Sequence, residues 1–302
     1  MENNFSIFVK QVAQKLIEHL GKDYQIESKQ AYDINGVMKY SLMLVKTGSD
    51  IHPCVNMDTY YNLHQSGIDL DTLVRAILDS CKEDSPVNMS AISDFTDWDN
   101  VKSHIYAKLI STEKNHSLLS SIPNRAYLDL SIVYYVRMES FFNDKYAVVQ
   151  ISNEHMEYWG VNEDMVYQSA WKNLTEPDET VVKNMADILN PLFFMKQIYP
   201  AGDGEDTSMY VLSNRYYING AVQMCDYGAL QEAAKMLESD LWILPSSVHE
   251  VILLPVCQTE DCAQGLADIV KEINDTQLEP QEILSYHVYH YSRKLGETTI
   301  AV

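Results

Sequence analysis

The sequence predicts an α+β protein with antiparallel sheets and with helices packed on their faces. Asn35-Gly36 lies between two strand-like runs, which is the strongest short signal for a β-hairpin. The stretch Met209–Val256 has the pattern strand, turn, strand, helix, strand, turn, strand. Between such segments, apolar residues recur at helical spacing. With 302 residues, 46% of them hydrophobic, the chain can bury a sizeable core.

The N-terminal part begins with a helix followed by a hairpin. Apolar residues from Phe5 to Leu20 form one helical stripe, and Gly21 ends it. Strands are expected at Tyr24–Tyr32 and Val37–Lys46, on either side of Asn35-Gly36. The remaining elements are a third strand at His52–Val55, a short helix from Asp58 and a second helix after Gly67.

The middle of the chain reads as helix, hairpin and helices. Apolar spacing predicts one long helix over Trp98–Leu119, and Tyr, Val and Ile predict a strand over Ala126–Met138. Asn162 is a suitable N-cap for a helix that ends near Leu174, with acidic residues in its first turn. The other elements expected here are a strand at Tyr146–Ile151, a helix at Glu154–Trp159 and a short helix at Val181–Leu189.

The C-terminal part is expected to be built around one buried hairpin. Leu241–Leu244 and Val248–Val256 flank the turn at Pro245-Ser246-Ser247. The run Val251–Val256 is almost continuously apolar, which indicates a central strand buried on both faces. The expected neighbours are a strand after the Asn214 turn, helices at Tyr227–Leu237 and Ala263–Ile273, and a β-like segment at Tyr286–Tyr291.

These elements group into three sequential subdomains. We expect an N-terminal α+β subdomain at residues 1–84, a helix-hairpin-helix subdomain at 85–200, and a hairpin/helix subdomain at 201–302. The punctuation at Glu83–Pro86 and the acidic loop Gly202–Asp206 mark the two boundaries.

The charge of the chain restricts its partners. Asp and Glu outnumber Lys and Arg by 43 to 22, giving a net charge of −21. Such a surface repels phosphate backbones and anionic membranes, so we expect no nucleic acid and no membrane as partner. A protein partner, if there is one, should present a basic surface. The sequence does not indicate an oligomeric state.

The N-terminus and the cysteines indicate the cellular compartment in which the protein is expected. No basic leader precedes an apolar core, and no run of apolar residues is long enough to cross a membrane. Five scattered cysteines are typical of reduced, buried thiols rather than of a disulfide framework. We therefore expect a cytoplasmic protein.

One short segment gathers groups that catalysis uses. Ser246, Ser247, His249 and Glu250 place hydroxyls, an imidazole and a carboxylate within five residues. However, neighbouring residues on a strand point to opposite faces, and the nucleophile elbow G-x-S-x-G is absent. The structural interpretation is a turn in which serine hydroxyls bond backbone amides.

Other site signals are weaker. The expected turn at Asn214, Arg215 and Tyr216 presents a guanidinium and an aromatic ring, and the chain has 20 tyrosines, a residue enriched at interfaces. In the tyrosine pairs, one ring is expected inside and its neighbour outside. His287 and His290 lack metal-site spacing on a strand, and no nucleotide-binding motif occurs. No metal and no cofactor is expected.

Three blocks of the sequence carry a resemblance to a known family. They are NGVMKYSLML with PCVNMDTYYNLHQSG; HIYAKLISTEKNHSLLSSIPNRAYLDLSIVYYV with ISNEHMEYWGVNEDMVY; and MYVLSNRYYINGA with SDLWILPSSVHEVILLPV and EINDTQLEPQEILSYHVYHY. Together they resemble an uncharacterised family of acidic proteins, a domain of unknown function typical of clostridial-type Gram-positive bacteria. The resemblance spans residues 35–291 and implies a cytoplasmic bacterial protein. It implies no activity and no catalytic residue.

Two functions remain open from the sequence. The favoured one is a non-enzymatic protein-binding or regulatory module that acts through an acidic, tyrosine-rich surface. The alternative is a hydrolase or transferase with its site at the Ser246–Glu250 turn. A cleft beside His249, with a carboxylate from elsewhere in the chain in hydrogen-bonding reach, would favour the enzyme.

Overall fold

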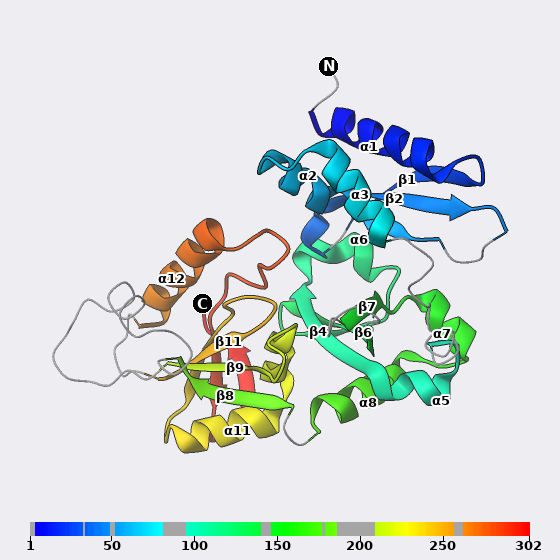
Figure 1. The fold of residues 1–302 in the computed structure, drawn as a ribbon. Helices are drawn as coiled ribbons and strands as arrows, with labels where there is room; N and C mark the ends of the chain where they lie inside the picture. Colours follow the sequence, from blue (N-terminus) through cyan, green and yellow to red (C-terminus); the bar gives the residue numbers. More distant parts are fainter. Residues whose placement is uncertain are drawn as a thin grey trace. The chain divides into compact units, whose positions relative to one another are not determined.

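The computed structural model confirms an α+β fold with antiparallel sheets (Figure 1). It describes residues 4–32, 34–48, 52–80, 95–139, 146–176, 179–185, 209–256 and 262–302. The chain divides into two compact units, Met1–Met89 and Ser90–Val302, and each is described by itself.

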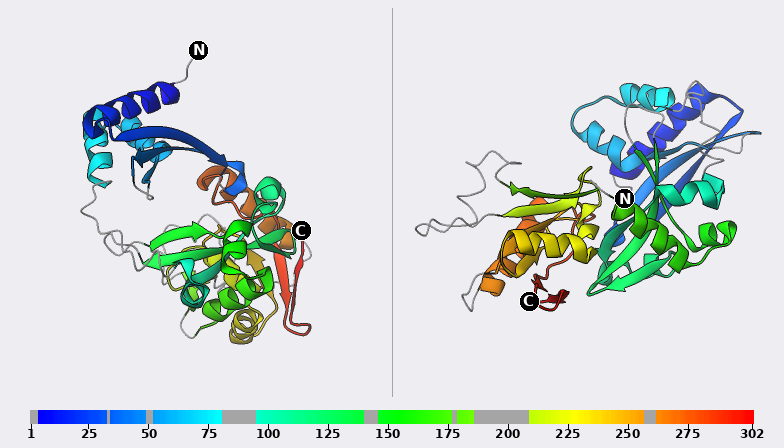
Figure 2. Two further views of the ribbon diagram at one scale, coloured as in Figure 1. Left: turned by 90° about the vertical axis from the view of Figure 1, so that its right-hand side faces the viewer. Right: turned by 90° about the horizontal axis from the view of Figure 1, so that it is seen from below.

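The unit Met1–Met89 is a three-stranded sheet with helices on one face (Figures 1 and 2). Its elements are α1 (Asn4–Leu20), β1 (Tyr24–Tyr32), η1 (Ile34–Gly36), β2 (Met38–Lys46), β3 (Cys54–Asn56), α2 (Met57–Gln65) and α3 (Leu70–Ser80). Val12 and Leu16 of α1 pack against Leu42 and Leu44 of β2 in one apolar core. Asn35 has a φ of 61°, the left-handed conformation that an Asn-Gly turn requires. The predicted helix, hairpin and third strand are confirmed.

The first half of Ser90–Val302 contains a four-stranded antiparallel sheet. Its elements are α5 (Trp98–Val101), η2 (Lys102–His104), β4 (Ile105–Ser111), η3 (Glu113–Asn115), α6 (His116–Leu119), β5 (Asn124–Tyr127), β6 (Leu130–Glu139), β7 (Tyr146–Gln150), α7 (Asn153–Trp159) and α8 (Glu163–Leu174). β6 pairs with β4, β5 and β7. The side chain of Asn162 accepts a hydrogen bond from the backbone N of Met165, so the predicted N-cap of α8 is confirmed.

The second half of this unit contains a six-stranded sheet in the order β13-β12-β10-β11-β9-β8. Its elements are β8 (Thr180–Asn184), β9 (Tyr210–Asn214), η4 (Gly220–Cys225), α11 (Tyr227–Met236), β10 (Leu241–Leu244), β11 (Val251–Pro255), α12 (Cys262–Gln277), β12 (Tyr289–Ser292) and β13 (Glu297–Ile300). β11 pairs with β10 and β9, so the predicted central strand is confirmed.

The two faces of β11 belong to different apolar cores. Val251 and Leu253 pack in a core that includes α11, whereas Ile252 and Leu254 pack with residues of α12. The two helices therefore cover opposite faces of the six-stranded sheet, as Figure 1 shows. The α11 core also contains residues of the four-stranded sheet. The division between 85–200 and 201–302 stays a prediction, and both expected boundaries, Glu83–Pro86 and Gly202–Asp206, lie outside the described residues.

The predicted long helix Trp98–Leu119 is wrong. The segment forms a helical turn, the strand β4 and a second short helix. Ile105 and Leu109 are four apart, which suits one face of a helix, but Ile105, Ala107 and Leu109 also alternate as one face of a strand. Pairing with β6 along the whole of β4 decides between these patterns.

Three other predicted elements need correction. The strand Ala126–Met138 is two strands, β5 and β6, that meet at Leu128, whose φ is 55°. The expected helix Val181–Leu189 is the strand β8 where the structure describes it. The strand expected before α11 is the 3₁₀ helix η4. In each case, sheet pairing or a tight turn overrides the local apolar pattern.

Cysteines and paired tyrosines also depart from expectation. Cys225 is a buried free thiol, Cys54 is a free but exposed one, and Cys262 is disulfide-bonded, so the expectation of reduced, buried thiols holds only for the first. Cys81 and Cys257 lie outside the described residues.

Tyr134 and Tyr135 are both buried, because β6 is covered on both faces, whereas one exposed ring was expected.

Candidate functional site

The turn between β10 and β11 is held by hydrogen bonds to its own serine. Ser247 Oγ accepts a hydrogen bond from the backbone N of His249 at 3.0 Å. The backbone N of Ser247 donates a hydrogen bond to Glu250 O at 3.2 Å. Val248 N donates to Glu282 O at 2.9 Å, which ties the turn to the segment after α12. Ser247 is buried and acts as a turn residue, which is the structural interpretation of the sequence.

The imidazole of His249 is positioned by groups from elsewhere in the chain. Its Nδ1 accepts a hydrogen bond from the backbone N of Asn219 at 3.1 Å. The neutral ring therefore carries its proton on Nε2, which lies 4.0 Å from Glu282 Oε1. Ser247 Oγ bonds the backbone of His249 rather than its ring. This arrangement lacks the contact between hydroxyl and base on which nucleophilic catalysis depends.

A tight backbone approach beside His249 fixes this turn. A side-chain carbon on Gly220 would lie 2.1 Å from Ser213 Oγ and 2.7 Å from His249 O. Ser213 Oγ donates to His249 O at 2.8 Å. Only glycine fits at position 220, so η4 and the start of β11 are held at a spacing that any larger residue would disturb.

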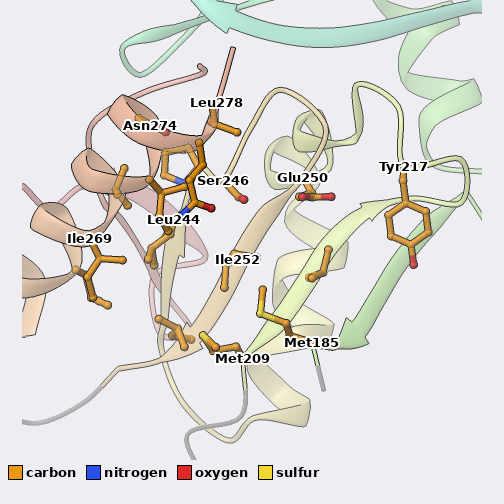
Figure 3. Close-up of a pocket in the computed structure, with 17 residues that line it drawn as sticks. Met185, Met209, Tyr217, Leu244, Ser246, Glu250, Ile252, Ile269, Asn274 and Leu278 are labelled. Carbon is orange, nitrogen blue, oxygen red and sulfur yellow. The ribbon is translucent and has the colours of Figure 1, made fainter. Parts of the chain in front are cut away.

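A pocket of about 340 Å³ opens on the other side of the turn, between α12 and the six-stranded sheet (Figure 3). The sheet contributes apolar side chains from three strands, and α12 contributes a facing row. Residues that line it include Val211, Leu244, Ile252, Leu254, Leu266 and Val270. Ser246 and Glu250 also line it, so two of the four residues singled out in this turn face a cavity.

Polar groups gather toward one end of the pocket. Figure 3 shows Ser246 and Glu250 well apart from Met185 and Met209, which lie at the opposite end. Burial raises the pKa of Glu250 above its ordinary value, and the nearby His249 partly opposes the shift. Asn274 also lines the pocket and is 1% exposed, and its Oδ1 has no hydrogen-bond partner among the described residues.

The second predicted site, Asn214-Arg215-Tyr216, is a tight turn with an arginine cluster. Asn214 Oδ1 accepts from the backbone N atoms of Tyr216 at 3.0 Å and of Ile218 at 3.3 Å. Arg215 Nη2 pairs at 3.0 Å with the buried carboxylate of Glu179. The Tyr216 ring lies 4.7 Å from Arg215 Cζ and 4.4 Å from that of Arg137. Asn214 therefore shapes the backbone, and Arg215 is engaged within the fold.

A third cluster, centred on Asp129, was not anticipated from the sequence. Its Oδ2 accepts from Ser285 Oγ and from His287 Nδ1, each at 2.9 Å, and its Oδ1 accepts from Tyr289 OH at 2.9 Å. Ser285 Oγ donates to the carboxylate and also lies 3.4 Å from His287 Nδ1. Because that nitrogen donates its own proton to Asp129, it cannot accept one from the serine, so the order of a catalytic triad is not present. Burial raises the pKa of Tyr289, whose hydroxyl stays protonated and donates. The cluster joins the β5–β6 turn to β12.

No spacing rule connects these residues. Asp129 lies more than 150 residues before its partners, and only the expected β character of Tyr286–Tyr291 gave a hint of their position. His290, three residues after His287, lies beside a different carboxylate; its Nε2 is 3.6 Å from Asp240 Oδ2. Across the described ranges, no group of three or more His, Cys, Asp and Glu residues has the geometry to hold a metal ion.

None of the described helices is both long enough and apolar enough to span a bilayer.

In comparisons with known proteins, the model of a family of unknown function, DUF5688, matches residues 5–293 of this chain. Neither the curated proteins nor the solved structures contain a match. The expected likeness to an uncharacterised family is confirmed.

Proposed function

We propose that this chain, which belongs to the DUF5688 family of unknown function, is a non-enzymatic binding protein whose pocket beneath α12 takes a small, largely apolar ligand. The pocket itself carries this proposal. Its volume of about 340 Å³ is within the range of small-molecule sites, and its lining combines many apolar side chains with a few polar groups at one end.

The state of the catalytic candidates supports binding over chemistry. Ser247 and the Nδ1 atom of His249 both accept hydrogen bonds from backbone N–H groups. Each is therefore occupied in holding the turn. The carboxylate of Glu282 is 4.0 Å from His249 Nε2, beyond ordinary hydrogen-bond distance.

The alternative is a hydrolase or transferase at the Ser246–Glu250 turn, and one observation favours it. Ser246 and Glu250 line the same pocket, and a carboxylate whose pKa is raised by burial is a suitable general base. Such an enzyme would convert a bound ester or amide into product. A binding protein would release it unchanged, so incubation with bound model esters followed by product analysis separates the two.

A blocked pocket tests the binding proposal. The neutral probe 2-phenylethanol should give saturation-transfer NMR signals with the full chain and lose them with Ile269→Trp, which places a ring at the pocket. Thr276→Trp is the matched control, because Thr276 is an exposed residue of the same helix outside the pocket. Signals that survive Ile269→Trp, or that are absent from the wild type, would refute the proposal.

We further propose that the protein acts in the bacterial cytoplasm and that a protein partner presents a basic surface to it. The net charge of −21 supports this, together with the exposed rings of Tyr158 and Tyr227, which offer amphipathic contact area. Exposed charges are screened beyond roughly 8 Å at physiological ionic strength, so association should weaken with salt. Tight, salt-sensitive binding of DNA or RNA in a shift assay would contradict this proposal.

A further inference from the structure

The polar end of the pocket offers acceptors without a positive charge. Glu250 carries a carboxylate, Asn274 an amide oxygen and Ser246 a hydroxyl. Among the described residues that line the pocket there is no Lys, Arg or His. The side-chain carboxylate of Glu250 also has no hydrogen-bond or ion-pair partner in the described part of the chain. A ligand that reaches this end therefore meets a carboxylate that has no counter-charge among the described residues lining the pocket.

Asn274 is fixed in a way that leaves one acceptor available. Its Nδ2 donates to Ser285 O at 2.9 Å, which uses the donating side of the amide. The Oδ1 atom is buried and is not hydrogen-bonded to any described residue. A buried acceptor left unpaired destabilises the folded protein, and a donor supplied by a ligand removes that cost.

The opposite end of the pocket suits an apolar body. Met185 and Met209 lie there, and Leu266 and Ile252 line its walls. Methionine side chains adapt to irregular shapes and make favourable contacts with aromatic rings. The site therefore combines an apolar, adaptable end with an end that accepts hydrogen bonds.

We infer that the pocket binds an organic amine, in which an apolar aryl or alkyl body carries a primary ammonium group. This inference rests on the proposed binding function. The ammonium supplies the counter-charge for Glu250 and an N–H donor for Asn274, while the body occupies the Met185 and Met209 end. A carboxylate or phosphate ligand would instead place a second negative charge beside Glu250.

Three probes of one shape test the inference by calorimetric titration of the full chain at pH 7. They are 2-phenylethylamine, the neutral 2-phenylethanol and the anionic 3-phenylpropanoate. Because only the amine brings a positive charge to the Glu250 carboxylate, it should bind about tenfold or more tightly than the alcohol. The carboxylate should bind more weakly than either.

Two variants separate the role of Glu250 from that of overall charge. Glu250→Gln should reduce the amine affinity about tenfold, and leave the alcohol affinity nearly unchanged. Glu272→Gln is the matched control, since Glu272 is exposed on α12 outside the pocket and its replacement changes the net charge equally. Should Glu250→Gln fail to fold, Asn274→Leu is the second variant and should weaken the amine more than the alcohol.

Each outcome decides between the two claims. If the alcohol binds in the pocket and the amine binds no better, or if Glu250→Gln leaves their ratio unchanged, the amine inference is wrong and the binding function stands. If none of the three probes binds the wild type, the binding function falls with it. An amine preference that Glu250→Gln removes and Glu272→Gln retains supports both.

Discussion

Truncation of two neighbouring residues in β11 should destabilise the protein by different amounts. Leu253 is fully buried in the core shared with α11, whereas Ile252 is 9% exposed and lines the pocket. Each change to alanine removes about three methyl or methylene groups, worth roughly 0.8 kcal/mol each. Leu253→Ala also leaves a closed cavity and should cost about 3–5 kcal/mol. Ile252→Ala only enlarges a space that already exists and should cost about 2 kcal/mol.

Urea unfolding followed by tryptophan fluorescence measures this difference directly. All four tryptophans, Trp98, Trp159, Trp171 and Trp242, lie in the unit Ser90–Val302, so the signal reports on the unit that contains β11. The midpoints should fall in the order wild type, Ile252→Ala, Leu253→Ala, with a similar slope for each. Equal losses, or a greater loss for Ile252→Ala, would refute the assignment of the two faces.

Three further predictions concern the polar groups and the tight turn. Glu250→Gln should raise the melting temperature at pH 7, because burial raises the pKa of Glu250 above 4.5 and so disfavours its ionised form in the folded state. This gain should shrink as the pH falls through the raised pKa, where the wild-type carboxyl becomes protonated; a constant gain would contradict it. Asp129→Ala leaves the buried Tyr289 hydroxyl without its acceptor and should cost about 2–3 kcal/mol in urea melts, and an unchanged midpoint would show that the cluster is not structural. Gly220→Ala forces a carbon within 2.7 Å of His249 O. It should cost about 1–3 kcal/mol in the same assay, and full stability would mean that the backbone there is free to shift.

Much of the fold follows from local pattern. The hairpin β1–β2 follows from Asn35-Gly36, which provides a left-handed turn residue between two strands. The position of β11 follows from its continuous apolar run, since only a strand covered on both faces buries successive residues. In both cases the local signal and the tertiary environment require the same structure.

The remainder depends on contacts that local pattern does not encode. The spacing of Ile105 and Leu109 fits both a helix and a strand, and only pairing with β6 distinguishes them. Ser246 and Glu250 were visible as candidates, but their shared cavity arises because α12 packs across the sheet. Asn274 has no distinguishing sequence signal, because its importance lies in one unpaired atom in a buried place.

The most direct test of the central claim locates a bound ligand by the methionine methyl groups. In protein labelled with ¹³C at the methionine methyls, the methyl group of Met209 reports on the pocket. The methyl group of Met57 reports on the core of the other unit, Met1–Met89. The substitution Met209→Leu assigns the first signal. Titration with 2-phenylethylamine should shift the Met209 signal in a saturable way and leave Met57 unchanged. A Met209 signal that does not move as the amine is added would contradict a ligand site beneath α12.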